Sequence, residues 1–319
     1  MKIGWVGVHA EGIPALQAVC EAEYDVVGLM TLRQEKAERR CGSGSYEGLC
    51  DRFKIPMFEV AHVNDSDSID ILKAWDCDVL VVLGWGQILC PDALRQARIG
   101  VVGAHASLLP HNRGSAPVNW AIIRDEKETG NSLIWLAEGV DAGDLIAQRS
   151  FPITSYDTCA TIYDSVAESN REMLLELLRE LEWGERPGLP QAEQDSAILP
   201  RRRPNDGLID WTRSSREIYN LIRAVTHPYP GAFAYLNGQA FRVWKAALLP
   251  LAQSPGEPGS ILGPVNSPDE QSCGLLVATG DGAIVLLEIE DESGHLLNGR
   301  QLSEITQQNW TGRQLRNAA

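Results

Sequence analysis

The sequence predicts an α/β domain built on a mostly parallel sheet, followed by a smaller β-rich domain. In the first part of the chain, short apolar runs alternate with stretches of helical periodicity, which is typical of a parallel sheet flanked by helices. Residues 184–204 contain four prolines and no periodic pattern, which indicates a linker. Beyond it, short strands bounded by glycine-rich turns surround one clear helix. We therefore expect a first domain over residues 1–195 and a second over 196–319.

The first domain is expected to have a Rossmann-like order of elements. The run CDVLVVLGW is its most apolar segment and is expected at the centre of the sheet, where both faces of a strand are covered. Thr158 caps a long amphipathic helix. The predicted strands are 2–8, 24–32, 77–85, 99–106 and 131–138, followed by the segment 145–153. The predicted helices are 13–22, 45–53, 67–75, 91–97, 117–125 and 158–182.

The second domain is different in kind. Its clear helix covers residues 215–226 and has one apolar face. The predicted strands are GAFAYL, QAFRVWKAAL, GLLVAT and AIVLLEIE. Short strands with tight turns between them are typical of a small barrel of the oligonucleotide/oligosaccharide-binding (OB) type. The sequence thus predicts an OB-like second domain.

The composition is that of a soluble globular protein, with 44% hydrophobic and 22% charged residues among 319. No run approaches the roughly 18 consecutive apolar residues of a membrane helix, and the first residues read as a strand instead of a signal peptide. The seven cysteines form no C-x-x-C pair, so free thiols are a better interpretation than a zinc site at Cys41 and Cys50. We expect a cytoplasmic protein with no membrane segment and no metal site.

The net charge of −15 is unevenly distributed along the chain. Residues 1–199 contain 17 basic and 31 acidic groups, whereas residues 200–319 contain 11 and 12. A protein that binds nucleic acid needs a basic face to displace the counterions of the phosphates. The local basic cluster is limited to Arg201, Arg202 and Arg203. The charge pattern therefore disfavours nucleic acid as a partner and favours a small ligand.

Two segments contain the residues on which a function can be based: GAHASLLPHNRGSAPVNWAII (103–123) and ETGNSLIWLAEGVDAGDLIAQ (128–148). With these motifs the chain resembles the formyltransferase family that uses 10-formyltetrahydrofolate, which includes methionyl-tRNA, glycinamide ribonucleotide and sugar N-formyltransferases. The later segments RRRPNDGLIDW and RAVTHPYPGAFAYLNGQAFRVW are most similar to the formyltransferase domain that modifies UDP-4-amino-4-deoxy-L-arabinose. The resemblance covers nearly the whole chain. It implies an N-formyltransferase with 10-formyltetrahydrofolate as formyl donor.

The implied reaction needs a group that handles protons. An amine attacks the formyl carbon while one proton leaves the amine and another reaches the folate nitrogen, and histidine titrates near the working pH. His105 ends a predicted strand, where open α/β sheets place their ligands. The resemblance implies that His105 is the catalytic acid and base and that Asp141 lies beside it. A neighbouring carboxylate favours the imidazolium form.

One position departs from the family pattern. The family normally has an asparagine two residues before the histidine, where its amide holds the formyl oxygen, and this chain has Gly103. Loss of such a donor costs roughly 3 kcal/mol in other enzymes. The Gly103 N–H or Asn131 could replace it, the enzyme could be slow, or the chain could bind folate without transferring the formyl group. We favour a replacement donor, because His105 and Asp141 are retained.

The resemblance also assigns folate contacts by position, largely through the main chain of two loops. These residues are Gln87, Ile88, Leu89, Ala137, Glu138, Gly139 and Val140, and the wall beside the histidine is Ser107, Leu108, Leu109 and Pro110. Arg113 is expected to shape the loop or to meet a phosphate. The arabinose-modifying relative has an arginine at a substrate-binding position that is Ser115 here, so the acceptor need not be the same sugar. The first turn lacks G-x-G-x-x-G spacing, which disfavours a nicotinamide cofactor and makes His9 an incidental residue.

Three hypotheses for the function follow. The leading one is an N-formyltransferase for a nucleotide-linked amino sugar, supported by the second-domain resemblance and the absence of a basic half. The second is methionyl-tRNA formyltransferase, which shares the two-domain plan but is expected to have a basic insertion and a basic second domain. The third is a non-catalytic folate-binding protein, suggested by Gly103. Sugar formyltransferases often dimerise through the second domain, so a homodimer is compatible with the resemblance.

Overall fold

A computed structural model describes residues 1–192, 197–249 and 254–316 of the chain. The expected domain boundary, between residues 195 and 196, lies outside the described residues. The chain divides into two compact units. The first comprises residues 1–118, 128–153 and 161–201, and the second comprises 119–127, 154–160 and 202–319. Two short segments from the first half of the chain therefore belong to the second unit.

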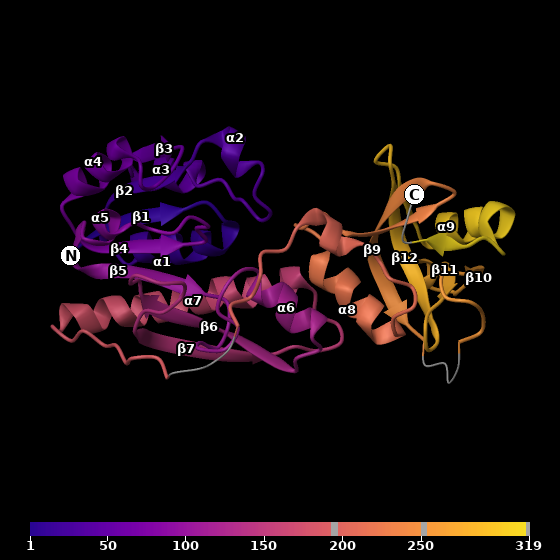
Figure 1. The fold of residues 1–319 in the computed structure, drawn as a ribbon. Helices are drawn as coiled ribbons and strands as arrows, with labels where there is room; N and C mark the ends of the chain where they lie inside the picture. The colour runs from indigo at the N-terminus through magenta and orange to yellow at the C-terminus, as the bar shows by residue number, and fades with distance from the viewer. Residues whose placement is uncertain (193–196, 250–253, 317–319) are drawn as a thin grey trace. The chain divides into compact units, whose positions relative to one another are not determined.

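The first unit is built on one sheet, with the strand order β3-β2-β1-β4-β5-β6-β7 (Figure 1). Neighbouring strands are parallel from β3 to β5, and the pairs β5–β6 and β6–β7 are antiparallel. The strands are β1 (Lys2–Gly7), β2 (Asp25–Leu32), β3 (Met57–Val60), β4 (Cys77–Leu83), β5 (Ala97–His105), β6 (Glu128–Trp135) and β7 (Leu145–Pro152). The predicted mostly parallel sheet is thus confirmed, with β3 as an additional edge strand.

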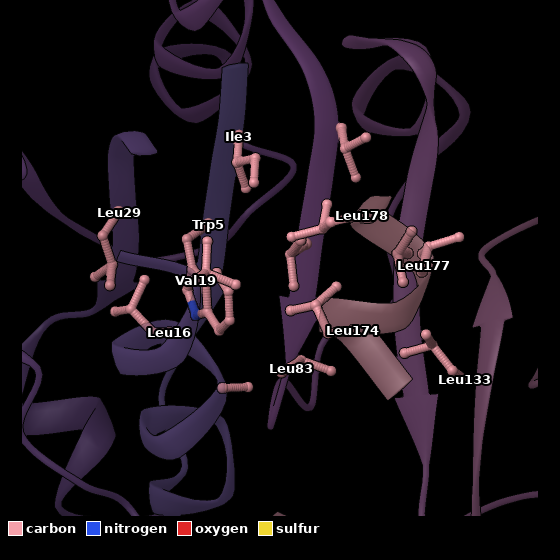
Figure 2. Close-up of a cluster of buried hydrophobic side chains, with 14 of the residues drawn as sticks. Ile3, Trp5, Leu16, Val19, Leu29, Leu83, Leu133, Leu174, Leu177 and Leu178 are labelled. Atoms are coloured by element: carbon pink, nitrogen blue, oxygen red, sulfur yellow. The ribbon is translucent and has the colours of Figure 1, made fainter. Parts of the chain in front are cut away.

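Helices cover both faces of this sheet, because alternate strand residues are apolar on both sides. Ile3 and Trp5 point to the face that is covered by α1 and α7, whereas Val6 points to the face of α4. Figure 2 shows Leu174, Leu177 and Leu178 of α7 directed at the strands. The helices of this unit are α1 (Ile13–Glu21), α2 (Gln34–Ala37), α3 (Glu47–Phe53), α4 (Ser66–Trp75), α5 (Pro91–Leu94) and α7 (Cys159–Glu182), whereas most of α6 (Pro117–Ile123) belongs to the second unit.

The second unit has an antiparallel sheet in the order β10-β11-β12-β9-β8-β14, and β13 pairs with β12. A bridge between Ser260 and Gln314 brings the two ends of this sheet together, and the Ile261 N–H donates to the Arg313 carbonyl at 2.8 Å. The strands are β8 (Ala232–Leu236), β9 (Gln239–Leu248), β10 (Ile261–Val265), β11 (Gly274–Ala278), β12 (Ala283–Asp291), β13 (Leu296–Asn298) and β14 (Leu315–Arg316). The expected OB-like, β-rich second domain is confirmed.

Two helices accompany this sheet, α8 (Ser215–Val225) and α9 (Gly299–Ile305). At the start of α8, the Ser214 hydroxyl accepts from the Glu217 N–H, and the Glu217 carboxylate accepts from the Ser214 N–H. This reciprocal capping box explains why the predicted helix begins where it does. The sequence patterns do not indicate α9, β10 or β13; in β10, Gly263 and Pro264 interrupt the pattern of a strand.

Within the described parts of the chain, no helix combines the length and the apolar character that a membrane crossing requires. The same residues contain no group of three or more His, Cys, Asp or Glu side chains that could hold a metal ion. All seven cysteines are free thiols.

We predict that Leu174→Ala lowers the free energy of unfolding by about 2–5 kcal/mol, because Leu174 is fully buried between α7 and the sheet. Urea unfolding followed by circular dichroism measures this. Glu172→Ala, on the exposed side of the same helix, is the control and should change stability by less than about 0.5 kcal/mol. Equal stability of the two variants would contradict the proposed packing.

Candidate active site

His105 is the last residue of β5, and its buried ring lies between two oxygen atoms. Its Nε2 is 2.8 Å from the Asn112 carbonyl oxygen, and its Nδ1 is 3.4 Å from Oδ2 of Asp141. A carbonyl only accepts hydrogen bonds, so Nε2 must hold a proton. Nδ1 is then the nitrogen that gains or loses a proton, and the Asp141 carboxylate stabilises the protonated form. The structure thus places together the histidine and the aspartate that the sequence motifs suggest.

Asp141 reaches His105 through a loop that reverses direction. Because β6 is antiparallel to β5, β6 ends near the middle of β5 and not next to His105. There the Leu136 N–H, directly after β6, donates to the Val101 carbonyl at 2.7 Å. The loop then returns toward the end of β5, and Asp141 adopts a left-handed backbone conformation with φ of 50°. Its Oδ2 also accepts from the Gly114 N–H at 2.9 Å. One carboxylate oxygen is therefore held between a main-chain N–H and the histidine ring.

Gln191 supports this loop from the segment that we expected to be a linker. Its amide donates to the carbonyls of Asp141, at 2.8 Å, and Gly143, at 2.7 Å. Its Oε1 accepts from Nε of Arg113 at 3.1 Å, so Arg113 acts on the loop through Gln191. Nearby, Leu199 donates to the Arg113 carbonyl and accepts from the Ser115 N–H. A single glutamine in a proline-rich stretch has no sequence signal that would indicate this role.

Residues 107–110, which lie beside the histidine, are held by hydrogen bonds to β6 and β7. Ser132, which pairs with His105 across the two strands, donates from its hydroxyl to the Ser107 carbonyl at 2.6 Å and accepts from the Leu109 N–H at 3.0 Å. Gln148 of β7 donates to the Leu109 carbonyl at 2.8 Å. Ser107 and Leu109 are buried, and Leu108 and Pro110 are half-buried. Ser132 and Gln148 are further positioning residues that the sequence did not indicate.

The position of Gly103 is filled by another side chain. A Cβ atom added to Gly103 would lie 2.6 Å from Cδ2 and 2.9 Å from Cγ of Leu136. Gly103 and His105 are two residues apart on β5 and so point to the same face of the sheet. An asparagine at position 103 would therefore collide with Leu136. Here the apolar side chain of Leu136 fills the space beside Gly103.

Asn131 is not a replacement donor. It is fully buried, and its amide donates to Oγ of Ser169 at 3.0 Å and to Oδ1 of Asn170 at 2.6 Å, both on α7. Asn131 precedes Ser132, the partner of His105, so its side chain points to the opposite face of the sheet. This candidate from the sequence analysis is incompatible with the geometry.

The two loops expected to hold folate expose apolar side chains. Ile88 is 71% exposed and Val140 is 37% exposed, whereas Leu89 is buried. Gln87 fixes its own loop: Oε1 accepts from the Val63 N–H at 2.8 Å, and Nε2 donates to the Ala61 carbonyl at 3.3 Å. Main chain and apolar side chains thus remain available, which suits a flat heteroaromatic ligand. Three other residues of the second loop are also exposed: Ala137, Glu138 and Gly139.

The second unit contains a cavity of about 320 Å³. Arg242 on its lining pairs with Glu290 at 2.9 Å, and Nε1 of Trp244 donates to the other oxygen of that carboxylate at 3.0 Å. The aromatic and acidic residues of the lining are Phe233, Tyr235, Phe241, Glu290, Asp291 and Glu292. A surface with this many carboxylates is unsuited to a polyanion.

Comparisons with known proteins agree with the fold and the motifs. The formyl transferase family model matches residues 18–178, and the model of the formyl transferase C-terminal domain matches 202–305. A methionyl-tRNA formyltransferase of Pelotomaculum thermopropionicum (strain DSM 13744 / JCM 10971 / SI) is 32% identical over 304 residues, which is 93% of this chain and 93% of that protein. The chain therefore belongs to the formyltransferase family. It is an N-formyltransferase with 10-formyltetrahydrofolate as formyl donor.

Solved structures share the fold at low sequence identity. HypX from Aquifex aeolicus, in complex with tetrahydrofolic acid, has a TM-score of 0.67 at 20% identity, covering 98% of this chain and 48% of HypX. This chain thus spans about half the length of HypX. WlaRD, a sugar 3N-formyl transferase studied in the presence of dTDP and 5-N-formyl-THF, has a TM-score of 0.63 at 18% identity, covering 89% of this chain and 96% of WlaRD.

We predict that Gly103→Ala lowers the free energy of unfolding by roughly 1–3 kcal/mol, because the added methyl group overlaps Leu136. In the Leu136→Ala background, where the clash is removed, Gly103→Ala should lower the free energy of unfolding by less than it does in the wild-type protein. Urea unfolding of the four proteins forms a double-mutant cycle. Strictly additive effects would show that the two positions are not in contact.

A second prediction concerns Gln191→Ala. Removing its amide releases the Asp141 loop, so kcat/KM for formyl transfer should fall about 10- to 100-fold through misplacement of Asp141. Steady-state kinetics with a matched Gln17→Ala control on the surface of α1 measures this. If both variants had wild-type rates, Gln191 would have no positioning role.

Proposed function

We propose that this formyltransferase acts on the primary amine of a small molecule, a nucleotide-linked amino sugar, with His105 and Asp141 as its proton-handling pair. The observation that supports the site is the placement of the His105 ring between the Asn112 carbonyl and the Asp141 carboxylate. Because the Nε2 proton is donated to the Asn112 carbonyl, proton exchange takes place at Nδ1, beside Asp141.

The proton path follows from this geometry. As the amine nitrogen bonds to the formyl carbon, it must lose a proton, and Nδ1 of His105 accepts it. The resulting imidazolium is stabilised by Oδ2 of Asp141, which the Gly114 N–H keeps in place. The same proton is then available to the leaving nitrogen when its bond to the formyl carbon breaks.

The loops around Ile88 and Val140 are proposed to hold the formyl donor. Both loops lie next to β5: β4 and β6 are its neighbours in the sheet. Their apolar side chains are exposed without a covering element, and burial of such surface by a ligand is favourable by about 25 cal/mol per Å². The formyl donor bound here would be adjacent to His105. Ser115 is proposed to face the acceptor, whereas Arg113 is already engaged by Gln191.

Charge favours a small acceptor over tRNA. Residues 200–319 carry nearly equal numbers of basic and acidic groups, and the cavity of the second unit is lined by carboxylates. In the local basic cluster, Arg202 stacks over Trp120, with its guanidinium 4.9 Å from the ring centroid. Tight tRNA binding requires several phosphate contacts from lysine or arginine.

Methionyl-tRNA is the second candidate acceptor, and the relative from Pelotomaculum that bears this name supports it. Binding of initiator tRNA, charged with methionine, separates the two candidates. Tight binding that weakens steeply between 50 and 200 mM salt, as counterion release requires, would favour tRNA. Turnover with UDP- or dTDP-linked amino sugars and no such binding would favour the small acceptor.

We predict that His105→Ala and Asp141→Asn each lower kcat by about 10²- to 10⁴-fold, because each removes one member of the proton-handling pair. Fluorescence titration with 5-formyltetrahydrofolate should show donor binding within a few-fold of wild type. His295→Ala, an exposed histidine of the second unit, is the matched control. Near-normal kcat in either site variant would exclude the assignment.

A further inference from the structure

Glu11 is an unused titratable group near the proposed active site. It belongs to the short 3-10 helix Ala10–Gly12, in the turn that follows β1. The side chain is half-buried, and across residues 1–192, 197–249 and 254–316 its carboxylate makes no hydrogen bond or ion pair. Burial raises the pKa of Glu11 to about 7. A carboxylate held in this way is available to a ligand.

Glu11 extends toward the strand that lies next to His105. A Cβ atom added to Gly84, directly after β4, would lie 3.3 Å from Cγ of Glu11 and 2.7 Å from Cβ of His9. Gly84 also has a φ of 62°, so glycine is required both by space and by conformation. Gly84 directly follows β4, and the parallel neighbour β5 ends at His105, so Glu11 and His105 both lie at the carboxyl-terminal edge of the sheet.

The groups around Glu11 stay uncharged near neutral pH, apart from one arginine. Burial and the charge of Arg40 lower the pKa of His9 to about 4, so His9 is neutral. Tyr46 donates to the His9 carbonyl at 2.8 Å, and burial raises the pKa of its hydroxyl. From α7, the Asn170 amide donates to the Glu11 carbonyl at 3.4 Å. Among these groups, Glu11 is therefore the one whose pKa lies near 7.

We propose that Glu11 binds the ammonium form of the acceptor and takes its proton, delivering a neutral amine to the formyl carbon beside His105. The proposal rests on the proposed function, because it assigns a second role at the same site. It also narrows the substrate class to amines that arrive as cations.

The proton balance is simple. The acceptor R–NH₃⁺ gives one proton to the Glu11 carboxylate, which leaves R–NH₂ and a neutral carboxylic acid. The amine then forms its bond to the formyl carbon, and the second proton follows the path through His105. Glu11 returns its proton to water before the next turnover. A carboxylate with a pKa of about 7 accepts a proton from an ammonium group more readily than an ordinary carboxylate with a pKa near 4.

The test is the pH dependence of kcat/KM for the acceptor that the wild-type enzyme turns over best among UDP- and dTDP-linked amino sugars. Glu11→Gln keeps the shape of the side chain and removes the charge. Glu59→Gln, exposed on β3, changes the net charge equally and is the control. At pH 7.5 we expect Glu11→Gln to lower kcat/KM for the acceptor about 100-fold, with the KM of the folate donor changed less than about 3-fold.

At pH 9.5 the acceptor amine is neutral in solution, and the deficit of Glu11→Gln should shrink to less than about 10-fold. A deficit that is equal at both pH values would assign Glu11 a structural role and overturn the proposal. Wild-type kcat/KM in Glu11→Gln would overturn it as well, while leaving the proposed function intact. Absence of turnover of every amino-sugar nucleotide by the wild-type enzyme would instead overturn both the proposed function and the role of Glu11.

Discussion

The site depends on the contact between the Asp141 carboxylate and the His105 ring. His105 is placed by the end of a parallel strand, but Asp141 comes from a loop that starts several residues away along β5, because β6 runs antiparallel. The loop can close this distance only if its main chain is held. The Gly114 N–H and the Gln191 amide do this from two other segments. These two groups therefore keep the Asp141 carboxylate next to the His105 imidazole.

This arrangement explains the chemistry that the site can perform. Nε2 of His105 is tied to a carbonyl, so the ring has one nitrogen at which a proton can be exchanged, and that nitrogen faces an anion. On the same face of the sheet, Leu136 fills the space beside Gly103 where the family has an amide. The proposed proton-handling pair is thus in contact, whereas neither a side chain at position 103 nor Asn131 is placed to hold a formyl oxygen.

Much of the fold could be predicted from local patterns. The apolar run Cys77–Leu83 lies at the centre of the sheet, and α7 buries the stripe that its periodicity indicates. Short elements such as β3, β13 and α9 were not indicated by the sequence pattern. Their positions depend on neighbours that are distant in the sequence, as with the pairing of β13 and β12.

The sequence by itself determined the class of protein and indicated His105 and Asp141 as the proposed pair, since each of these residues lies in a short, continuous motif. Only the tertiary structure decided how these residues are supported. Ser132 fastens the wall, Gln191 holds the loop, and Leu136 occupies the space at Gly103. Each of these contacts joins residues that lie between 25 and 50 positions apart in the sequence. Such pairs leave no local pattern, because the register of the sheet and the return of the loop bring them together.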